Sequence, residues 1–217
     1  ITEVSLKVLP VAPGEATLMC AGVSQVQALS LINRWGGQPL PLNASAWVHD
    51  DTLPVAQDCL FVRLRGAVAA VEAAVQKMGA QVQALGAAVT RMDNAQAGPD
   101  WTACRDQTLP FFTPPSPDLC LWRLSLPQTA PVLALPGHPL VEWHGGLRWL
   151  WAPASAAAEL QALHQELEAA AEPGTPNTDK FLAVNERFHM RLLEIANNRW
   201  RDQMVADLRK VMKLNRH

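Results

Sequence analysis

Hydrophobic residues recur along the chain with two different periods, and the period changes from one segment to the next. In residues 59–65 every second position is apolar, which predicts a strand with one buried face. In residues 24–35 the apolar positions are spaced by three and four, which predicts an amphipathic helix. These two patterns predict strands at residues 1–10, 15–20, 45–49, 59–65, 119–126 and 140–151, and helices at 24–35, between Gly66 and Gly79, at 101–107 and at 154–171.

Two neighbouring stretches repeat the order strand then helix. In the first, Ser24 and Gln27 have the spacing of a capping box, and the apolar stripe Val26, Leu29, Ile32 and Trp35 follows. In the second, the strand at 59–65 leads into the helix that we expect to end at Gly79. The repeat predicts an α+β fold of ferredoxin-like type, a mixed or antiparallel sheet with covering helices on one face.

The chain changes character near residues 165–176. Before this point lie 15 of the 17 prolines, all four cysteines and seven of the eight tryptophans. Residues 177–217 contain nine Lys or Arg against five Asp or Glu, although the whole chain carries a net charge of −2. Apolar residues spaced by three and four predict two amphipathic helices there, first at Phe181, Val184, Phe188, Leu192 and Ile195, then at Val205, Leu208 and Met212.

Composition excludes several classes of protein. With 49% hydrophobic residues, 18% charged residues and a net charge of −2, the sequence suggests neither disorder nor a nucleic-acid partner. No apolar run reaches the roughly 20 residues of a membrane helix, and no secretory leader is visible. The four cysteines are scattered without a CxxC pair. We therefore expect reduced, mostly buried thiols in a cytoplasmic protein, with no transmembrane segment.

Residues 1–163 resemble the C-terminal half of the FAD subunit of bacterial glycolate oxidase, a flavoprotein of the vanillyl-alcohol-oxidase type. The resemblance lies in the segments ITEVSLKVLP, WGGQPLPLNASAW, LFVRLRGAVAAVEAAVQKMG, CRDQTLPFF and VEWHGGLRWL. It implies that residues 1–10 are the last strand of an otherwise missing FAD-binding domain and that residues 11–163 form the cap domain. The closing FDP-x-G-x-FNPGR segment usual in such subunits does not occur here.

The resemblance also implies an activity and partners. The parent activity is hydride transfer from glycolate, a small 2-hydroxy acid, to FAD, giving glyoxylate. The parent works with other glycolate oxidase subunits, a flavin subunit and an iron–sulfur subunit, in a complex that can lie on the inner membrane face. The sequence has no GxGxxG or Walker phosphate loop. We therefore expect this chain alone to bind no FAD and to be inactive.

Such chemistry needs a base for the hydroxyl proton and a cation for the carboxylate. In the segment Trp143-His144-Gly145-Gly146, His144 is a candidate base and Arg148 a candidate cation; the alternative is a glycine-kinked hairpin with an incidental histidine. Arg105 is a further candidate, with a surface ion pair to Asp106 as the alternative. Arg63 and Arg65 share one strand face, where they either bind an anion or point to solvent. His49 and His138 give no signal.

Residues 165–217 resemble the middle of a FadR C-terminal domain (FCD), the effector domain of GntR-type transcription regulators. The resemblance is closest in the segment NERFHMRLLEIANN. The family places a metal-binding Asp or Asn four residues before a His, which implies Asn185 and His189 as part of an incomplete metal site. A polar pair on a helix surface is the alternative, because two protein ligands rarely hold a divalent metal.

Three hypotheses follow for the whole chain, which resembles two truncated proteins joined near residues 163–176. The first is an oxidoreductase fragment, the cap portion of a flavin-linked 2-hydroxy-acid oxidase subunit. The second is a binding module, an FCD-like helical fragment at 164–217 that senses an effector or metal. The third is an inactive fusion product. The first hypothesis covers about three-quarters of the sequence and is therefore the leading one.

Overall fold

The computed structural model describes residues 10–51, 55–162 and 165 of the chain. The chain divides into two compact units, Ile1–Ala171 and Glu172–His217. All described residues lie in the first unit. The expected strand at 1–10, except its last residue, and the expected helices beyond residue 177 lie outside the described residues.

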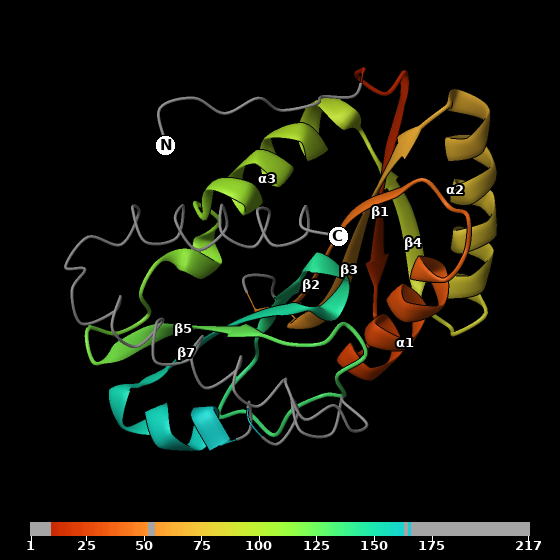
Figure 1. Cartoon of the computed structure of the whole chain (residues 1–217). Helices are drawn as coiled ribbons and strands as arrows, with labels where there is room; N and C mark the ends of the chain where they lie inside the picture. The colour runs from red at the N-terminus through yellow and green to blue at the C-terminus, as the bar shows by residue number, and fades with distance from the viewer. Residues whose placement is uncertain (1–9, 52–54, 163–164, 166–217) are drawn as a thin grey trace, which may run out of the picture. The chain divides into compact units, whose positions relative to one another are not determined.

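The first unit is built on a seven-stranded sheet with the strand order β4-β1-β3-β2-β6-β7-β5 (Figure 1). Every pairing in it is antiparallel. The strands are β1 (Gly14–Ala21), β2 (Leu42–Asp50), β3 (Gln57–Gly66), β4 (Ala88–Met92), β5 (Leu119–Ser125), β6 (Leu140–Glu142) and β7 (Leu147–Pro153). The helices are α1 (Gln25–Gly36), α2 (Val68–Gln83) and α3 (Asn94–Asp106), with 3₁₀ turns η1 (Pro110–Phe112), η2 (Trp143–Gly145) and η3 (Ala154–Ala156).

The first four strands and two helices have the ferredoxin-like arrangement. Their chain order is β1-α1-β2-β3-α2-β4, and their order in the sheet is β4-β1-β3-β2. The predicted α+β class is therefore confirmed. Strands β6, β7 and β5 extend this sheet beyond β2, and we call these three strands the extension.

Helix α1 begins as its sequence predicts. Ser24 accepts a hydrogen bond from the Gln27 backbone at 3.4 Å, and the Gln27 side chain accepts one from the Ser24 backbone at 3.0 Å, which completes the capping box. Ile32 and Trp35 of the expected stripe are 1% and 0% exposed. Val26 is 65% exposed, so its place on that stripe was wrong; Ala28 and Leu31 are buried instead.

Two helix boundaries differ from the prediction, and one strand was missed. Helix α2 continues through Gly79 to Gln83, because Gly79 is buried against Val89 of β4 and the left-handed turn comes later, at Gly86 with φ +80°. Strand β4 was not predicted, since its five residues are mostly exposed and do not alternate. Helix α3 begins at Asn94, capped by Asp93, and not near residue 101, because the chain accommodates Pro99 inside the helix.

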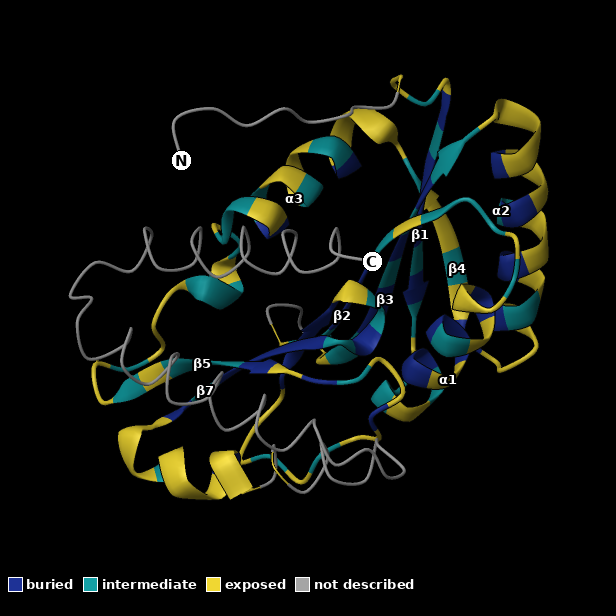
Figure 2. Cartoon of the chain, viewed as in Figure 1, coloured by how far each residue is buried: buried dark blue, intermediate teal, exposed yellow. Residues whose placement is uncertain are grey.

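The two sheet faces carry different cores. Helices α1 and α2 cover one side of the ferredoxin-like part, the α1/α2 face (Figure 2). The side chains of Leu18, Trp47 and Val62 belong to the core on this face and are at most 2% exposed. The other side, the α3 face, is covered by α3, whose Trp101 donates a hydrogen bond to Thr17 at 2.9 Å. Its core is smaller and mixes aromatic, cysteine and aliphatic side chains, among them Ala46, Cys104, Leu140 and Trp149.

Candidate functional site

The turn between β6 and β7 has the most unusual backbone among the described residues. Trp143, His144 and Gly145 follow one another with φ values of 51°, 55° and 93°. A left-handed conformation costs a residue other than glycine roughly 1–2 kcal/mol. Strain of this kind persists only where the surroundings hold it, and it is concentrated at functional sites. The turn is therefore a candidate functional site.

Ser45 of β2 holds this turn against the sheet. Its hydroxyl oxygen accepts a hydrogen bond from the backbone N–H of His144 at 3.1 Å, and it lies 3.1 Å from Nδ1 of the same residue. Gly145 packs so closely that a Cβ there would lie 2.9 Å from Leu29 Cδ2 and 3.0 Å from the Gln128 carbonyl oxygen. Ser45 is 4% exposed, so its proximity to the imidazole serves to position His144 and not to attack a substrate.

His144 is half-buried, and burial lowers the pKa of its imidazole below the ordinary value of 6.5. The ring is therefore neutral near pH 7, as a general base requires. A serine oxygen has two lone pairs, so Ser45 can accept from both the backbone N–H and Nδ1–H. In that tautomer the Nε2 lone pair of His144 is available to take a proton.

An aromatic and guanidinium stack lies beside the turn. Trp143 is 57% exposed, and Arg123 of β5 places its Cζ 5.9 Å from the centre of the Trp143 ring. The same guanidinium carbon lies 5.8 Å from the ring of Trp149 on β7. Both distances fall within the range of a cation–π contact. The stack links the exposed tryptophan to the core of the α3 face.

A buried carboxylate lies one residue before the turn. Glu142 is 8% exposed; one of its oxygens accepts a hydrogen bond from the Cys104 thiol at 2.8 Å, and the other accepts one from Trp149 Nε1 at 2.6 Å. Burial, and next the Glu142 charge, raise the pKa of the Cys104 thiol well above its usual range. Cys104 is therefore a protonated hydrogen-bond donor and not a nucleophile.

Arg148, the predicted cation, is fully buried at 0% exposure. Its guanidinium donates hydrogen bonds to the carbonyl oxygens of Pro131 at 2.6 Å and Ala130 at 2.7 Å, while its Nε has no partner in the described structure. Burial lowers the pKa of this guanidinium to about 10. In this structure Arg148 therefore fastens the loop between β5 and β6 to β7.

The other predicted arginines take part in ion pairs. Arg105 is exposed and bonds Asp106 through Nε at 2.7 Å, which is the alternative that the sequence left open. Arg63 and Arg65 both contact Glu15 of β1, at distances that include 2.7 Å from Arg63 Nε and 2.9 Å from Arg65 Nε. The structure brings His144 and Arg148 into the same hairpin and does not link Arg105 to them. Asn185 and His189 lie outside the described residues.

Two histidines that gave no signal in the sequence meet in the structure. The rings of His49 on β2 and His138 in the loop before β6 stack with centroids 4.0 Å apart. Asp58 of β3 lies 2.7 Å from Nδ1 of His49. Among the described residues there is no group of three side chains that could hold a metal ion. His49 and His138 are 89 positions apart, so local sequence patterns gave no reason to pair them.

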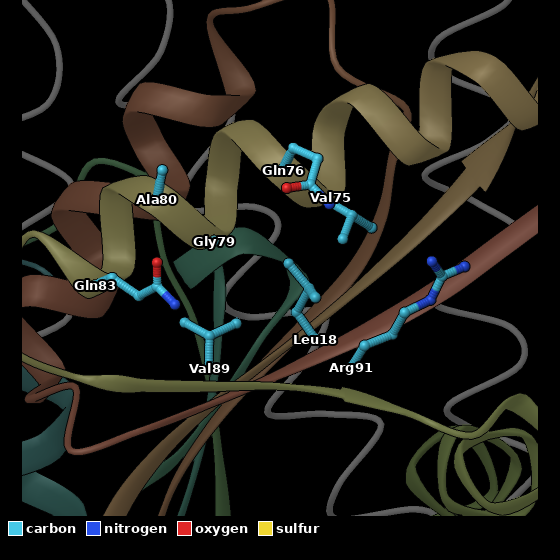
Figure 3. A pocket seen from close by; sticks show the side chains of 8 residues that line it. All are labelled: Leu18, Val75, Gln76, Gly79, Ala80, Gln83, Val89 and Arg91. Atoms are coloured by element: carbon cyan, nitrogen blue, oxygen red, sulfur yellow. The ribbon is translucent and has the colours of Figure 1, made fainter.

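A shallow groove runs between α2 and β4 (Figure 3). Leu18 of β1 forms its floor, and Val75 and Val89 line its apolar part. The cation at the groove, Arg91, forms a bidentate ion pair with Glu72, in which each terminal nitrogen lies 2.8 Å from a carboxylate oxygen. The groove does not fit the pyrophosphate of a dinucleotide, because its one cation is already paired. No helix in the described part of the chain is long and apolar enough to cross a membrane.

Comparison with known proteins gives two similarities. Residues 151–217 match the FCD domain family. The chain is 35% identical over 165 residues to glycolate oxidase subunit GlcE of Escherichia coli (strain K12), and the aligned part makes up 76% of this chain. It spans only 39% of that protein's length. No solved structure matches the chain. The two resemblances inferred from the sequence are confirmed.

Proposed function

We propose that the first unit is the cap portion of a flavin-linked 2-hydroxy-acid oxidase subunit. The observation that carries this proposal is the 35% identity to a glycolate oxidase subunit over 165 residues, which is 76% of this chain. The parent reaction would oxidise glycolate to glyoxylate and pass a hydride to FAD. The groove between α2 and β4 does not fit a dinucleotide, and in this proposal the FAD would be held by a domain outside residues 10–162 or by a separate flavin subunit.

The division of the chain follows from the same proposal. Residues 1–10 would complete the FAD-binding domain, residues 11–163 would form the cap, and residues 164–217 would be an FCD-like addition. The partners would be the flavin and iron–sulfur subunits of a glycolate oxidase, with the complex on the cytoplasmic side of the inner membrane. The substrate would be a small 2-hydroxy acid.

Within the cap, His144 is the residue that we propose as the base. It is neutral near pH 7, Ser45 fixes its orientation, and it lies next to the most exposed tryptophan of the described chain. Arg148 supports this role indirectly, because it holds the loop whose Gln128 side chain bonds the Trp143 carbonyl oxygen at 3.4 Å. A direct clamp on the substrate carboxylate would require Arg148 to exchange its carbonyl partners. Arg105, exposed and paired with Asp106, would act only if the rest of the protein covered it.

A domain exchange tests the proposal. Residues 10–162 of this chain would replace the aligned segment of Escherichia coli GlcE, co-expressed with its partner subunits, and glycolate-dependent dye reduction would be measured. We expect an active chimera, and we expect His144→Gln in it to lower kcat by about 10² or more if His144 is the base. Arg105→Gln serves as a control and should have little effect. A folded, flavin-containing chimera that does not oxidise glycolate would exclude the proposed function.

The FCD match favours a second candidate function for residues 151–217, binding of an effector or metal. In this alternative Asn185 and His189 would supply two of the ligands, because residues four positions apart share a face if the segment is helical. Metal analysis of the purified chain after dialysis against Zn²⁺ or Ni²⁺ tests it. Stoichiometric metal that is lost in His189→Ala would support the alternative, and metal content at the level of the variant would reject it.

A further inference from the structure

Glu142 is a buried carboxylate at a position that would suit an apolar side chain. It is the last residue of β6, it is 8% exposed, and its partner on β7 is the buried Leu147. Its two hydrogen-bond donors, the Cys104 thiol and the Trp149 indole N–H, are both neutral. A buried carboxylate costs free energy that an apolar residue would not, so its presence here calls for an explanation.

The backbone of Glu142 is held without the help of the carboxylate. It is extended, with φ −126° and ψ −179°, and it pairs with Ala46 of β2 and with Leu147 of β7. Such pairing uses backbone groups, which every residue carries. The carboxylate therefore acts on something other than the strand to which it belongs.

One carboxylate oxygen leads back to the turn through two aromatic rings. It accepts a hydrogen bond from Trp149 Nε1 at 2.6 Å, which fixes the indole of Trp149. The guanidinium carbon of Arg123 lies 5.8 Å from the centre of that ring and 5.9 Å from the centre of the Trp143 ring. Trp143 follows Glu142 in the chain. These four residues therefore form a closed circuit of contacts, and we call it the Glu142 circuit.

The other carboxylate oxygen connects the Glu142 circuit to α3. It accepts a hydrogen bond from the thiol of Cys104, in the last turn of α3, at 2.8 Å. Helix α3 is itself bound to the sheet, because Trp101 donates a hydrogen bond to Thr17 of β1 at 2.9 Å. A side chain whose partners are themselves fixed keeps its own position more firmly.

The strained turn needs a restraint at Trp143. Trp143 and His144 have φ values of 51° and 55°, in the left-handed region. If Trp143 returned to a negative φ, the chain after it would change direction and the His144 ring would leave Ser45. Ser45 bonds His144, and Gln128 reaches the Trp143 carbonyl oxygen only at 3.4 Å. The Glu142 circuit supplies the restraint on the Trp143 side chain.

We propose that Glu142 is a positioning residue for His144. Through the Glu142 circuit it keeps the turn left-handed and holds the His144 imidazole against Ser45. This role rests on the proposed function, in which His144 is the base. Glu142 itself touches no substrate and exchanges no proton; it acts on geometry, because a base must lie within about 2.6–3.2 Å of the hydroxyl whose proton it takes.

Proton–nitrogen correlation NMR of the histidine rings in the full chain tests the proposal, with the His144 signals assigned by their loss in His144→Gln. In the wild type we expect the Nδ1–H tautomer and a pKa below 6.5. In Glu142→Gln one acceptor oxygen replaces two. We expect His144 to move toward the Nε2–H tautomer and its pKa to rise toward 6.5, because the ring is held less firmly against Ser45.

Trp149→Phe is a second variant, which removes the indole N–H and keeps an aromatic ring beside Arg123. It should shift His144 in the same direction. Glu15→Gln is the matched control, because Glu15 is a carboxylate on the same face of the sheet that bonds Arg63 and not the turn. It should leave the His144 signals unchanged. Circular dichroism of each variant verifies that the fold is retained.

An unchanged tautomer and pKa of His144 in folded Glu142→Gln and Trp149→Phe would overturn the proposal. In an active chimera with Escherichia coli GlcE, Glu142→Gln should lower kcat about tenfold or more with little change in KM, since geometry and not binding is altered. A shift of the His144 signals with an unchanged kcat would exclude His144 as the base and leave its positioning by Glu142 established. A chimera that does not oxidise glycolate would exclude the proposed function, and the NMR result would still decide the role of Glu142.

Discussion

The ferredoxin-like part and the extension share one sheet but are stabilised differently. Under α1 and α2 the core consists of side chains such as Leu18, Ile32 and Val62, and no Asp, Glu, Lys or Arg is buried there. In the described chain, the two buried charged residues are Glu142 and Arg148, and both lie in the extension. The strained turn at Trp143 is there as well.

This difference separates a scaffold from a candidate site. An apolar core needs only complementary shapes, and it stabilises the fold wherever it occurs. Buried charges and left-handed residues cost free energy and are retained only where the surroundings compensate for them. The extension therefore contains the features whose cost calls for an explanation by function, and the ferredoxin-like part provides the rigid support.

The largest expected effect lies in the scaffold. Trp35→Ala removes a fully buried side chain whose Nε1 also donates a hydrogen bond to Gln81 at 2.6 Å. We expect the free energy of unfolding to fall by about 3–5 kcal/mol. Trp143→Ala is the matched control, because that tryptophan is 57% exposed, and it should cost less than about 1 kcal/mol. Equal losses of unfolding free energy in the two variants, measured by urea titration, would contradict the difference between the two regions.

The next effect concerns the buried cation of the extension. Arg148→Met leaves the Ala130 and Pro131 carbonyl oxygens without their donors, and we expect a loss of about 2–3 kcal/mol in urea unfolding. Arg105→Met, at a guanidinium exposed and paired on the surface, should change stability by no more than about 0.5 kcal/mol. If Arg148→Met were as stable as the wild type, the loop would not depend on this contact.

A pair of glycines separates strain from close packing. Gly145→Ala meets both a φ of +93° and contacts of 2.9 and 3.0 Å, and we expect a loss of about 2–3 kcal/mol. Gly22 has a φ of +83°, but a Cβ at this position would meet nothing within 4 Å, so Gly22→Ala should cost only about 1 kcal/mol. Thermal unfolding of both variants measures the difference. Identical losses of stability in the two variants would mean that the atoms around Gly145 move aside easily for an added Cβ.

The smallest effect is a pH dependence at His144. Burial lowers its pKa in the folded state, so between that pKa and 6.5 the unfolded chain binds more protons than the folded chain. Stability is therefore lost as the pH falls below about 6.5, the ordinary pKa of histidine. His144→Gln should reduce this loss in urea titrations at a series of pH values. An unchanged slope in the variant would assign the acid sensitivity to other groups.

The sequence predicted best those elements whose determining residues lie close together in the chain. Helix α1 was predicted closely because its capping box and the spacing of its apolar residues lie within one short segment. Strand β4 was missed because an exposed edge strand needs no alternating pattern. The ends of α2 and α3 were misplaced because Gly79 and Pro99 usually stop helices, whereas here packing against β4 and the Asp93 cap override them.

The candidate site was predictable only in part. The two glycines after His144 marked the hairpin, and the structure has a turn at that place. The strain at Trp143 was not visible in the sequence. The contact of Ser45 was not visible either, because Ser45 is 99 positions away from His144. The partners of Arg148 are backbone carbonyl groups, which every residue carries, so no sequence pattern identifies them. The contact between His49 and His138 was missed because it is also non-local.

Three of the four thiols are buried, which leaves one cysteine accessible for chemical labelling. Cys20, Cys59 and Cys104 are buried, and burial raises the pKa of each, that of Cys20 to about 12. Cys120 is exposed on β5. Because thiol reagents attack the accessible thiolate, a fluorescent maleimide should label Cys120 selectively.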